Sequence, residues 1–233
     1  MKSILLAVAT AGALFGGGAI AMQVADSPQA DDAALHPQRI VIGLDLSRSN
    51  PLIADPAFAA KVGARVAGIV HEMGFASEVH VRTFGNYDAT SNNFAYDVVL
   101  SVRNRPDNVA AEVQRLIAGT PLLVKTGKWR AQENTNILAF LDNVSHSIGC
   151  TGMPTTIILA SDGIEDSDYA KLIHASSQLP PSEGKPFANC AELKILGLGQ
   201  GASSPRLTTR LRTEWSGWAR AAGFARFVGL NDW

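Results

Sequence analysis

Val41-Ile-Gly-Leu-Asp45-Leu-Ser47-Arg-Ser49 is the stretch that decides the fold, because an apolar run in it gives way to one carboxylate and two hydroxyls at alternate positions. The apolar half is typical of a strand that is buried on both faces of a sheet. Ligands of open parallel α/β sheets bind outside the carboxyl ends of the strands, so Asp45, Ser47 and Ser49 are expected at the functional edge. The same residues also suit a turn that caps the next helix, and this stretch alone favours neither interpretation.

Two later stretches favour the functional interpretation. Asn134-Thr135-Asn136-Ile-Leu-Ala-Phe-Leu opens a predicted helix with a hydroxyl at its start, and Thr155-Thr-Ile-Ile-Leu-Ala-Ser161-Asp162-Gly163 is a second buried strand that ends in a carboxylate. With these stretches the chain resembles the von Willebrand factor type A (VWA) family. The metal-ion-dependent adhesion site (MIDAS) of that family consists of Asp-x-Ser-x-Ser, a distant Thr and an Asp after the fourth strand. The matching positions, in the family's order, are Asp45, Ser47, Ser49, Thr135 and Asp162.

The resemblance extends over residues 39–229 and implies both a fold and a ligand. The implied fold is α/β and doubly wound, with a mostly parallel central sheet, one antiparallel edge strand and helices on both faces. The implied ligand is Mg²⁺, with Mn²⁺ as the alternative, because hydroxyl oxygens are hard ligands that disfavour zinc and copper. In the family the two Asp residues often act through bound water, so the ion stays attractive to an Asp or Glu of a partner protein.

Hydrophobic periodicity, capping residues and breakers predict the other elements. We expect helices at residues 56–73, 105–117, 136–148, 166–178 and 204–222, and further strands at residues 78–84, 95–102, 193–198 and 225–228. The short connection between the strands at 78–84 and 95–102 predicts a hairpin, which makes the second of them the antiparallel edge strand. Gly74 is expected to end the first helix in a left-handed conformation.

Residues 120–134 show no clear period and lead directly into Thr135, so they are expected to cross the metal-bearing edge of the sheet. Trp129 lies among cationic residues in this segment. Two interpretations stay open for its side chain: it shapes a surface for a partner, or it packs the loop onto the core.

The composition is that of an ordinary globular protein, with 233 residues, 46% hydrophobic and 18% charged residues and a formal net charge of −1. This charge balance gives no electrostatic footprint for nucleic acid, which we do not expect as a partner.

The amino terminus has the pattern of a secretory signal. Lys2 precedes an apolar run over residues 4–20, and Ala19-Ile-Ala21 supplies the small residues of a cleavage site after Ala21. An uncleaved membrane anchor is the alternative, which Gly16-Gly-Gly18 and the small residues of the run disfavour.

The predicted organisation is therefore a signal peptide at residues 1–21, a flexible linker at residues 22–38 and a VWA-like domain at residues 39–233. After cleavage we expect no membrane span and a periplasmic or secreted location.

The two cysteines, Cys150 and Cys190, are expected to form one disulfide, since exported chains reach an oxidising compartment. Each comes just before a predicted strand, and these two strands should be parallel neighbours. Both cysteines should therefore lie at the same edge of the sheet, opposite the metal. Two buried free thiols are the alternative.

Two other functions are considered beside a binding module. A Mg-dependent hydrolase of the haloacid dehalogenase type needs a second carboxylate two residues after its first Asp, where this chain has Ser47. The chain also lacks a Gly-x-Ser-x-Gly elbow and a Cys beside a candidate base, so we do not expect an enzyme. The other alternative is a structural or assembly component of a cell-envelope complex. No paired ligand spacing connects the five histidines, which are expected at the surface: His36, His71, His80, His146 and His174.

Overall fold

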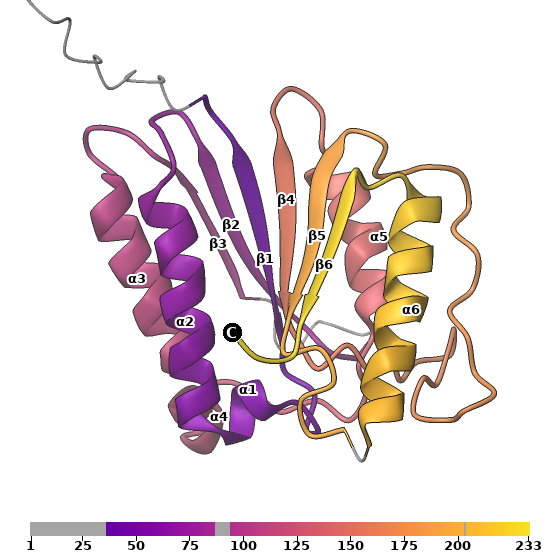
Figure 1. Cartoon of the computed structure of the whole chain (residues 1–233). Coiled ribbons are helices and arrows are strands. Elements are labelled where there is room, and N and C mark those ends of the chain that lie inside the picture. The colour runs from indigo at the N-terminus through magenta and orange to yellow at the C-terminus, as the bar shows by residue number, and fades with distance from the viewer. Residues whose placement is uncertain (1–35, 87–93, 203) are drawn as a thin grey trace, which may run out of the picture. The chain divides into compact units, whose positions relative to one another are not determined.

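The computed structural model describes residues 36–86, 94–202 and 204–233, and a six-stranded sheet forms its centre (Figure 1). The order of the strands across the sheet is β3-β2-β1-β4-β5-β6. The strands are β1 (Arg39–Asp45), β2 (Glu78–Phe84), β3 (Ala95–Val99), β4 (Thr155–Ala160), β5 (Cys190–Leu196) and β6 (Arg226–Leu230). Every neighbouring pair is parallel except β2 and β3, which are antiparallel. The predicted fold class, including its antiparallel edge strand, is confirmed.

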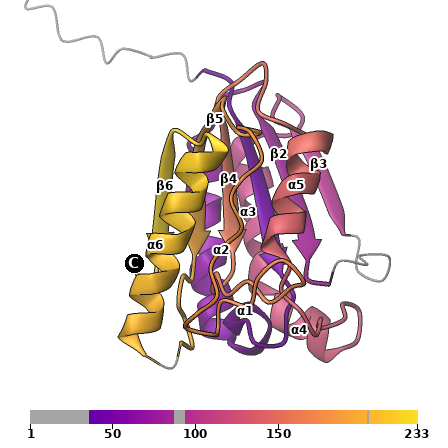
Figure 2. The ribbon, with the colours of Figure 1, turned by 90° about the vertical axis from the view of Figure 1, so that its right-hand side faces the viewer.

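Helices cover both faces of this sheet. They are α1 (Pro51–Ala54), α2 (Pro56–His71), α3 (Pro106–Ala118), α4 (Thr120–Lys125), α5 (Ile137–Ser147) and α6 (Pro205–Ala222). Helices α2 and α3 lie on one face, and α5 and α6 lie on the other (Figure 1), the face that is turned toward the viewer in Figure 2. Asp55 caps α2 as its sequence predicts, since its side chain accepts hydrogen bonds from the amides of Ala57 and Phe58.

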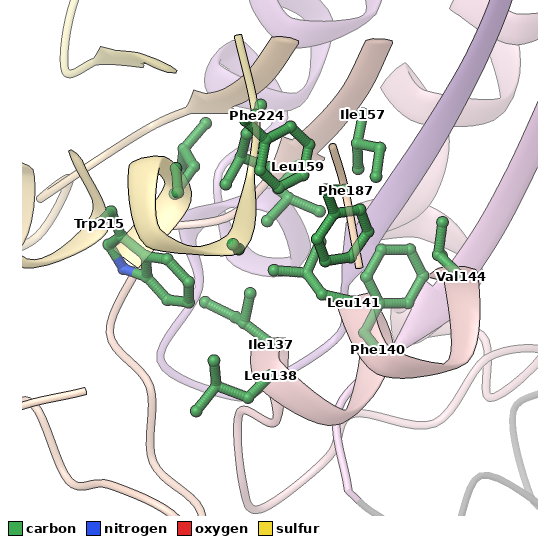
Figure 3. Packing of buried hydrophobic residues seen from close by; sticks show 14 of the residues in the cluster. Ile137, Leu138, Phe140, Leu141, Val144, Ile157, Leu159, Phe187, Trp215 and Phe224 are labelled. Atoms are coloured by element: carbon green, nitrogen blue, oxygen red, sulfur yellow. The ribbon is translucent and has the colours of Figure 1, made fainter. Parts of the chain in front are cut away.

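The apolar core consists of two clusters, one on each face of the sheet. Alternate residues of β1 enter opposite clusters: Val41 packs on the side of α5 and α6, while Ile42 packs on the side of α2 and α3. Figure 3 shows the first cluster, in which Leu141 of α5 and Trp215 of α6 point toward a common interior. Because β1 is buried on both faces, its chemistry is confined to its ends.

The parallel strands define two ends of the domain. We call the end at which they begin the amino-terminal pole, and the end at which they finish the carboxyl-terminal pole, which lies at the bottom of Figure 1. Cys150 and Cys190 form a disulfide at the amino-terminal pole, with a Cα–Cα distance of 5.1 Å. Cys190 is the first residue of β5 and is in register with Thr155, the first residue of β4. The predicted bond and its place opposite Asp45 are confirmed.

The prediction of a helix at residues 166–178 is wrong. Residues 166–178 form an irregular segment with turns and isolated bridges instead of a helix. The backbone of Asp166 pairs with Thr135, and the guanidinium of Arg210 on α6 donates to the carbonyls of Leu172, His174 and Ser177. These bonds to distant residues replace the local bonds that a helix would make.

Two smaller details also differ from the prediction. Helix α2 ends at His71, and the residue with a left-handed backbone after it is Ala76, with φ of 63°, rather than Gly74. Residues 120–125, for which no regular structure was predicted, form the short helix α4 with Pro121 in its first turn.

The predicted signal peptide and all but the last three residues of the predicted linker lie outside the described residues. Among those three residues, Gln38 accepts a hydrogen bond from the amide of Glu78 and donates its own amide to Ser77 Oγ. No helix within the described ranges is long and apolar enough to span a membrane.

Candidate metal centre

The end of β1 places Asp45 and Ser47 at the carboxyl-terminal pole. Asp45 is the last residue of the strand, and its side chain is fully buried. Its Oδ1 accepts a hydrogen bond from the amide of Ser47 at 2.9 Å, and its Oδ2 accepts one from Ser161 Oγ at 2.7 Å. Both carboxylate oxygens are therefore held in place by the neighbouring loop and by the end of β4.

Asn50 fixes the loop that carries the two serines. Its Nδ2 donates to the carbonyls of Asp45 and Ala160, both at 3.1 Å, and its Oδ1 accepts from the amide of Leu52 at the start of α1. One buried side chain thus ties the loop to β1, β4 and α1. Asn50 was not among the predicted site residues, although an Asn directly before Pro51 is a recognisable helix cap.

The segment that carries Thr135 lies against the same loop. The amide of Gln132 donates to the carbonyl of Leu46 at 2.8 Å, and the amide of Arg48 donates to the carbonyl of Gln132 at 2.9 Å. Three residues further on, buried Thr135 exchanges two backbone hydrogen bonds with Asp166. Thr135 therefore stands between the serine loop and the segment that follows Asp162.

Asp162 follows β4 and is 2% exposed. Its Oδ1 accepts a hydrogen bond from the amide of Ile164 at 2.9 Å. Burial, together with the negative charge of Asp45, raises the pKa of Asp162 to about 7, and burial also raises the pKa of Asp45. The two carboxylates follow the adjacent parallel strands β1 and β4, so they lie at the same end of the sheet.

Glu165 is a third buried carboxylate, and it was not among the predicted site residues. Its Oε2 accepts from the amides of Ile137 and Leu138 at 2.8 and 3.2 Å, in the first turn of α5, and its Oε1 accepts from Ser167 Oγ. Burial raises its pKa to about 7. Such a carboxylate complements the positive end of the helix dipole and orients the start of α5, just after Thr135.

The hydroxyl of Ser47 is the feature that best fits a cation. Its Oγ is buried and, apart from an interaction with the carboxylate of Asp45, has no hydrogen-bond partner among the described residues. In the same part of the chain, Asp45 and Asp162 form no ion pair with Lys, Arg or His. A divalent cation would satisfy the hydroxyl oxygen and compensate the two negative charges.

Ser49 completes the loop and is exposed to solvent. Within the described ranges, no three His, Cys, Asp or Glu side chains converge in a way that could hold a metal ion. A cation at this pole would therefore depend on hydroxyl ligands beside the carboxylates, and the structure brings Ser47 and Thr135 to the same end of the sheet as Asp45 and Asp162.

Two other expectations concern residues outside the site. Trp129 is half-buried and packs against Phe94, with 5.2 Å between the ring centroids, at the margin of the core, which favours the interpretation that it packs its loop onto the core. Four of the five histidines are exposed as expected. His80 is the exception, because it lies half-buried between Glu78 and Asp97.

The α/β domain is similar to solved structures of other proteins. No protein-family model and no curated protein sequence match the chain. Among solved structures, it is similar to an aerotolerance-related membrane protein from Bacteroides fragilis NCTC 9343 whose crystal structure carries multiple mutations to serines. The identity is 14%, the match covers 83% of this chain and 92% of that chain, and the TM-score is 0.46. It is also similar to the conserved hypothetical protein BatB from Bacteroides thetaiotaomicron, with 14% identity, coverage of 84% of this chain and 91% of that chain, and a TM-score of 0.45.

Proposed function

We propose that this chain is a VWA-type binding module that holds Mg²⁺, or Mn²⁺, at its carboxyl-terminal pole and binds a protein partner through an Asp or Glu of that partner. The observation that carries the proposal is the buried Ser47 Oγ, which among the described residues has no hydrogen-bond partner apart from its interaction with the Asp45 carboxylate. Leaving such a group unsatisfied costs about 1–3 kcal/mol, so its retention beside two buried carboxylates supports a role as a ligand.

The proposed ligands divide into two kinds. The hydroxyls of Ser47, Ser49 and Thr135 are neutral and would bind the ion directly, while Asp45 and Asp162 would supply charge, directly or through water. Both oxygens of Asp45 already accept hydrogen bonds, which supports an orienting and charge-compensating role for it. When bound, the ion would act as a Lewis acid that attracts the partner's carboxylate.

The contacts of Asp45 also favour binding over hydrolysis. A phosphohydrolase of the type considered above uses its first Asp as a nucleophile and needs a second carboxylate two residues on. Here the oxygens of Asp45 are engaged by Ser47 and Ser161, and the position of the second carboxylate is a serine. We therefore propose that the module binds its partner without chemical turnover.

The disulfide between Cys150 and Cys190 supports a periplasmic or secreted location for the module, because disulfides persist in oxidising compartments. It agrees with the secretory pattern of residues 1–21 in the sequence.

Isothermal titration with Mg²⁺ and with Mn²⁺ tests the metal site. Thr135→Ala, and the double change Ser47→Ala with Ser49→Ala, should each lower the affinity at least about tenfold, the lower bound known for residues that only orient metal ligands. Thr209→Ala, which removes an exposed hydroxyl on α6, is the matched control and should bind as the wild type does. Circular dichroism checks that all three variants fold.

Unchanged metal affinity in both test variants would remove this site from the proposal. If the metal binds but an identified partner is retained in EDTA, the ion has a structural role only.

A further inference from the structure

Exposed hydrophobic side chains gather at the amino-terminal pole, away from the candidate metal centre. Phe75 is 54% exposed, Val99 52% and Val102 81%. Phe75 lies in the segment before β2, Val99 is the last residue of β3, and Val102 follows it. The two segments are adjacent, because the amide of Ala76 donates to the carbonyl of Leu100 and the amide of Leu100 donates to the carbonyl of Ser77, both at 2.8 Å. Three large apolar groups on segments that are bonded to each other form a patch rather than scattered surface residues.

Two arginines extend this patch. Arg103 follows Val102 directly, and Arg105 precedes α3; both are exposed. Within the described ranges, neither forms an ion pair. We name the five residues Phe75, Val99, Val102, Arg103 and Arg105 the amino-terminal patch.

Nearby acids leave the arginines largely uncompensated. Asp107 pairs with His71 at 2.9 Å, and Asp97 pairs with Arg82 at 2.8 Å. Glu72 is exposed at the same pole and opposes the two arginines in part. The excess of free charge on the patch is therefore positive.

The chain enters the domain beside the patch. Gln38 is bonded to Ser77 and Glu78, which belong to the turn that carries Phe75 and to the strand after it. The apolar run over residues 4–20 precedes this entry point by 18 residues, which reach at most about 60 Å when extended. Until the predicted cleavage after Ala21, insertion of that run into a membrane would tether the amino-terminal pole to the lipid surface.

We propose that the amino-terminal patch docks on an anionic phospholipid bilayer. Phe75, Val99 and Val102 would enter the boundary between headgroups and acyl chains, and the two arginines would bind lipid phosphates. The candidate metal centre lies at the opposite ends of the parallel strands, so docking leaves it directed away from the membrane and open to a partner.

Flotation of the full chain with vesicles tests the docking. Arg103→Ser with Arg105→Ser should weaken binding to vesicles that contain phosphatidylglycerol, by about fivefold for each arginine at low salt, and should change binding to pure phosphatidylcholine little. Phe75→Ser with Val102→Ser should weaken binding to both. Leu122→Ser with Ile173→Ser is the matched control, since these side chains are similarly exposed at the other pole and should have no effect.

A second measurement separates binding by the patch from binding by the apolar run of residues 4–20, which the secretory-signal pattern predicts to enter bilayers before it is cleaved. Val102→Trp should be quenched by brominated acyl chains beyond the signal of the native tryptophans, and Ile173→Trp should not. Equal quenching of the two, or equal binding by patch and control variants, overturns the proposal. Loss of self-association in the patch variants, with vesicle binding unchanged, overturns it as well and identifies an interface between two copies of the chain.

Discussion

Gly43 allows α5 to pack closely on β1. A Cβ at this position would lie 2.7 Å from Phe140 Cε1 on α5 and 3.0 Å from Leu159 Cδ2 on β4. Gly43→Ala should therefore destabilise the domain by about 1–3 kcal/mol through overpacking, as measured by urea unfolding.

Gly68 is the matched control for this prediction. It lies on the exposed side of α2, where a Cβ meets nothing within 4 Å. Gly68→Ala should stabilise the helix by about 0.5–1 kcal/mol. Destabilisation by both changes would point to a general intolerance of the fold rather than to the contact with Phe140.

The buried carboxylates predict how stability depends on pH. The pKa values of Asp162 and Glu165 are raised to about 7, and that of Asp45 is raised as well. Between pH 4 and 7 the folded chain thus holds protons that the unfolded chain has released, so without a divalent ion its stability should fall as the pH rises through this window.

Urea unfolding at pH 5 and pH 8, in EDTA and in Mg²⁺, measures this effect. Under the proposed function, Mg²⁺ should reduce the loss at pH 8, because it binds the ionised site in the folded chain. Asp162→Asn should flatten the profile in EDTA. A stability that rises between pH 5 and pH 8 in EDTA would contradict the raised pKa values.

At the scale of elements, α5 depends on a carboxylate from another segment. Glu165→Ala removes the acceptor for the amides of Ile137 and Leu138, and should lower the free energy of unfolding by about 1–3 kcal/mol. Glu165→Gln keeps one acceptor oxygen and should lose less. Asp142→Ala, at an exposed position on the same helix, provides the control. Chemical denaturation of the three variants compares them, and equal losses for Ala and Gln would argue against a role in capping.

Local signals predicted most of the elements correctly. Asp55-Pro56 begins α2, Gly149 and Gly223 adopt positive φ after α5 and α6, and the alternation at residues 78–84 gives β2. The segment at residues 166–178 was predicted wrongly because its backbone bonds reach Thr135 and Arg210, which no local window contains. Propensity is overridden where distant partners take up the backbone groups.

In the candidate site, too, local sequence predicts some residues, while others depend on distant contacts. Asp45 and Asp162 could be placed at one pole because they follow strands that the sequence shows to be buried and parallel. Gln132 and Glu165 could not be recognised, because each acts through contacts with a segment remote in sequence. Asn50 could be recognised as the cap of α1, but not as the link to Ala160 at the end of β4.

At the scale of the whole molecule, the disulfide closes a loop of 40 residues that contains β4 and the irregular segment after it. The chain-entropy model gives a stabilisation of about 3–4 kcal/mol for such a loop. Cys150→Ala with Cys190→Ala should lose about this amount in urea unfolding without change at the candidate metal centre, which lies at the other pole. Thiol counting on the denatured, unreduced protein provides the check, since two free thiols per chain would contradict the bond.

The central position of β1 has a mechanical consequence. The chain enters β1 at the amino-terminal pole, and β6 finishes at the carboxyl-terminal pole, with β1 held between β2 and β4. Tension applied between Arg39 and Leu230 therefore pulls β1 along its own axis and loads its hydrogen bonds to both neighbours together, in shear. Freeing β1 would require those bonds to break nearly at once rather than one after another, so β1 would resist extension in a module that is tethered at one pole and bound to a partner at the other.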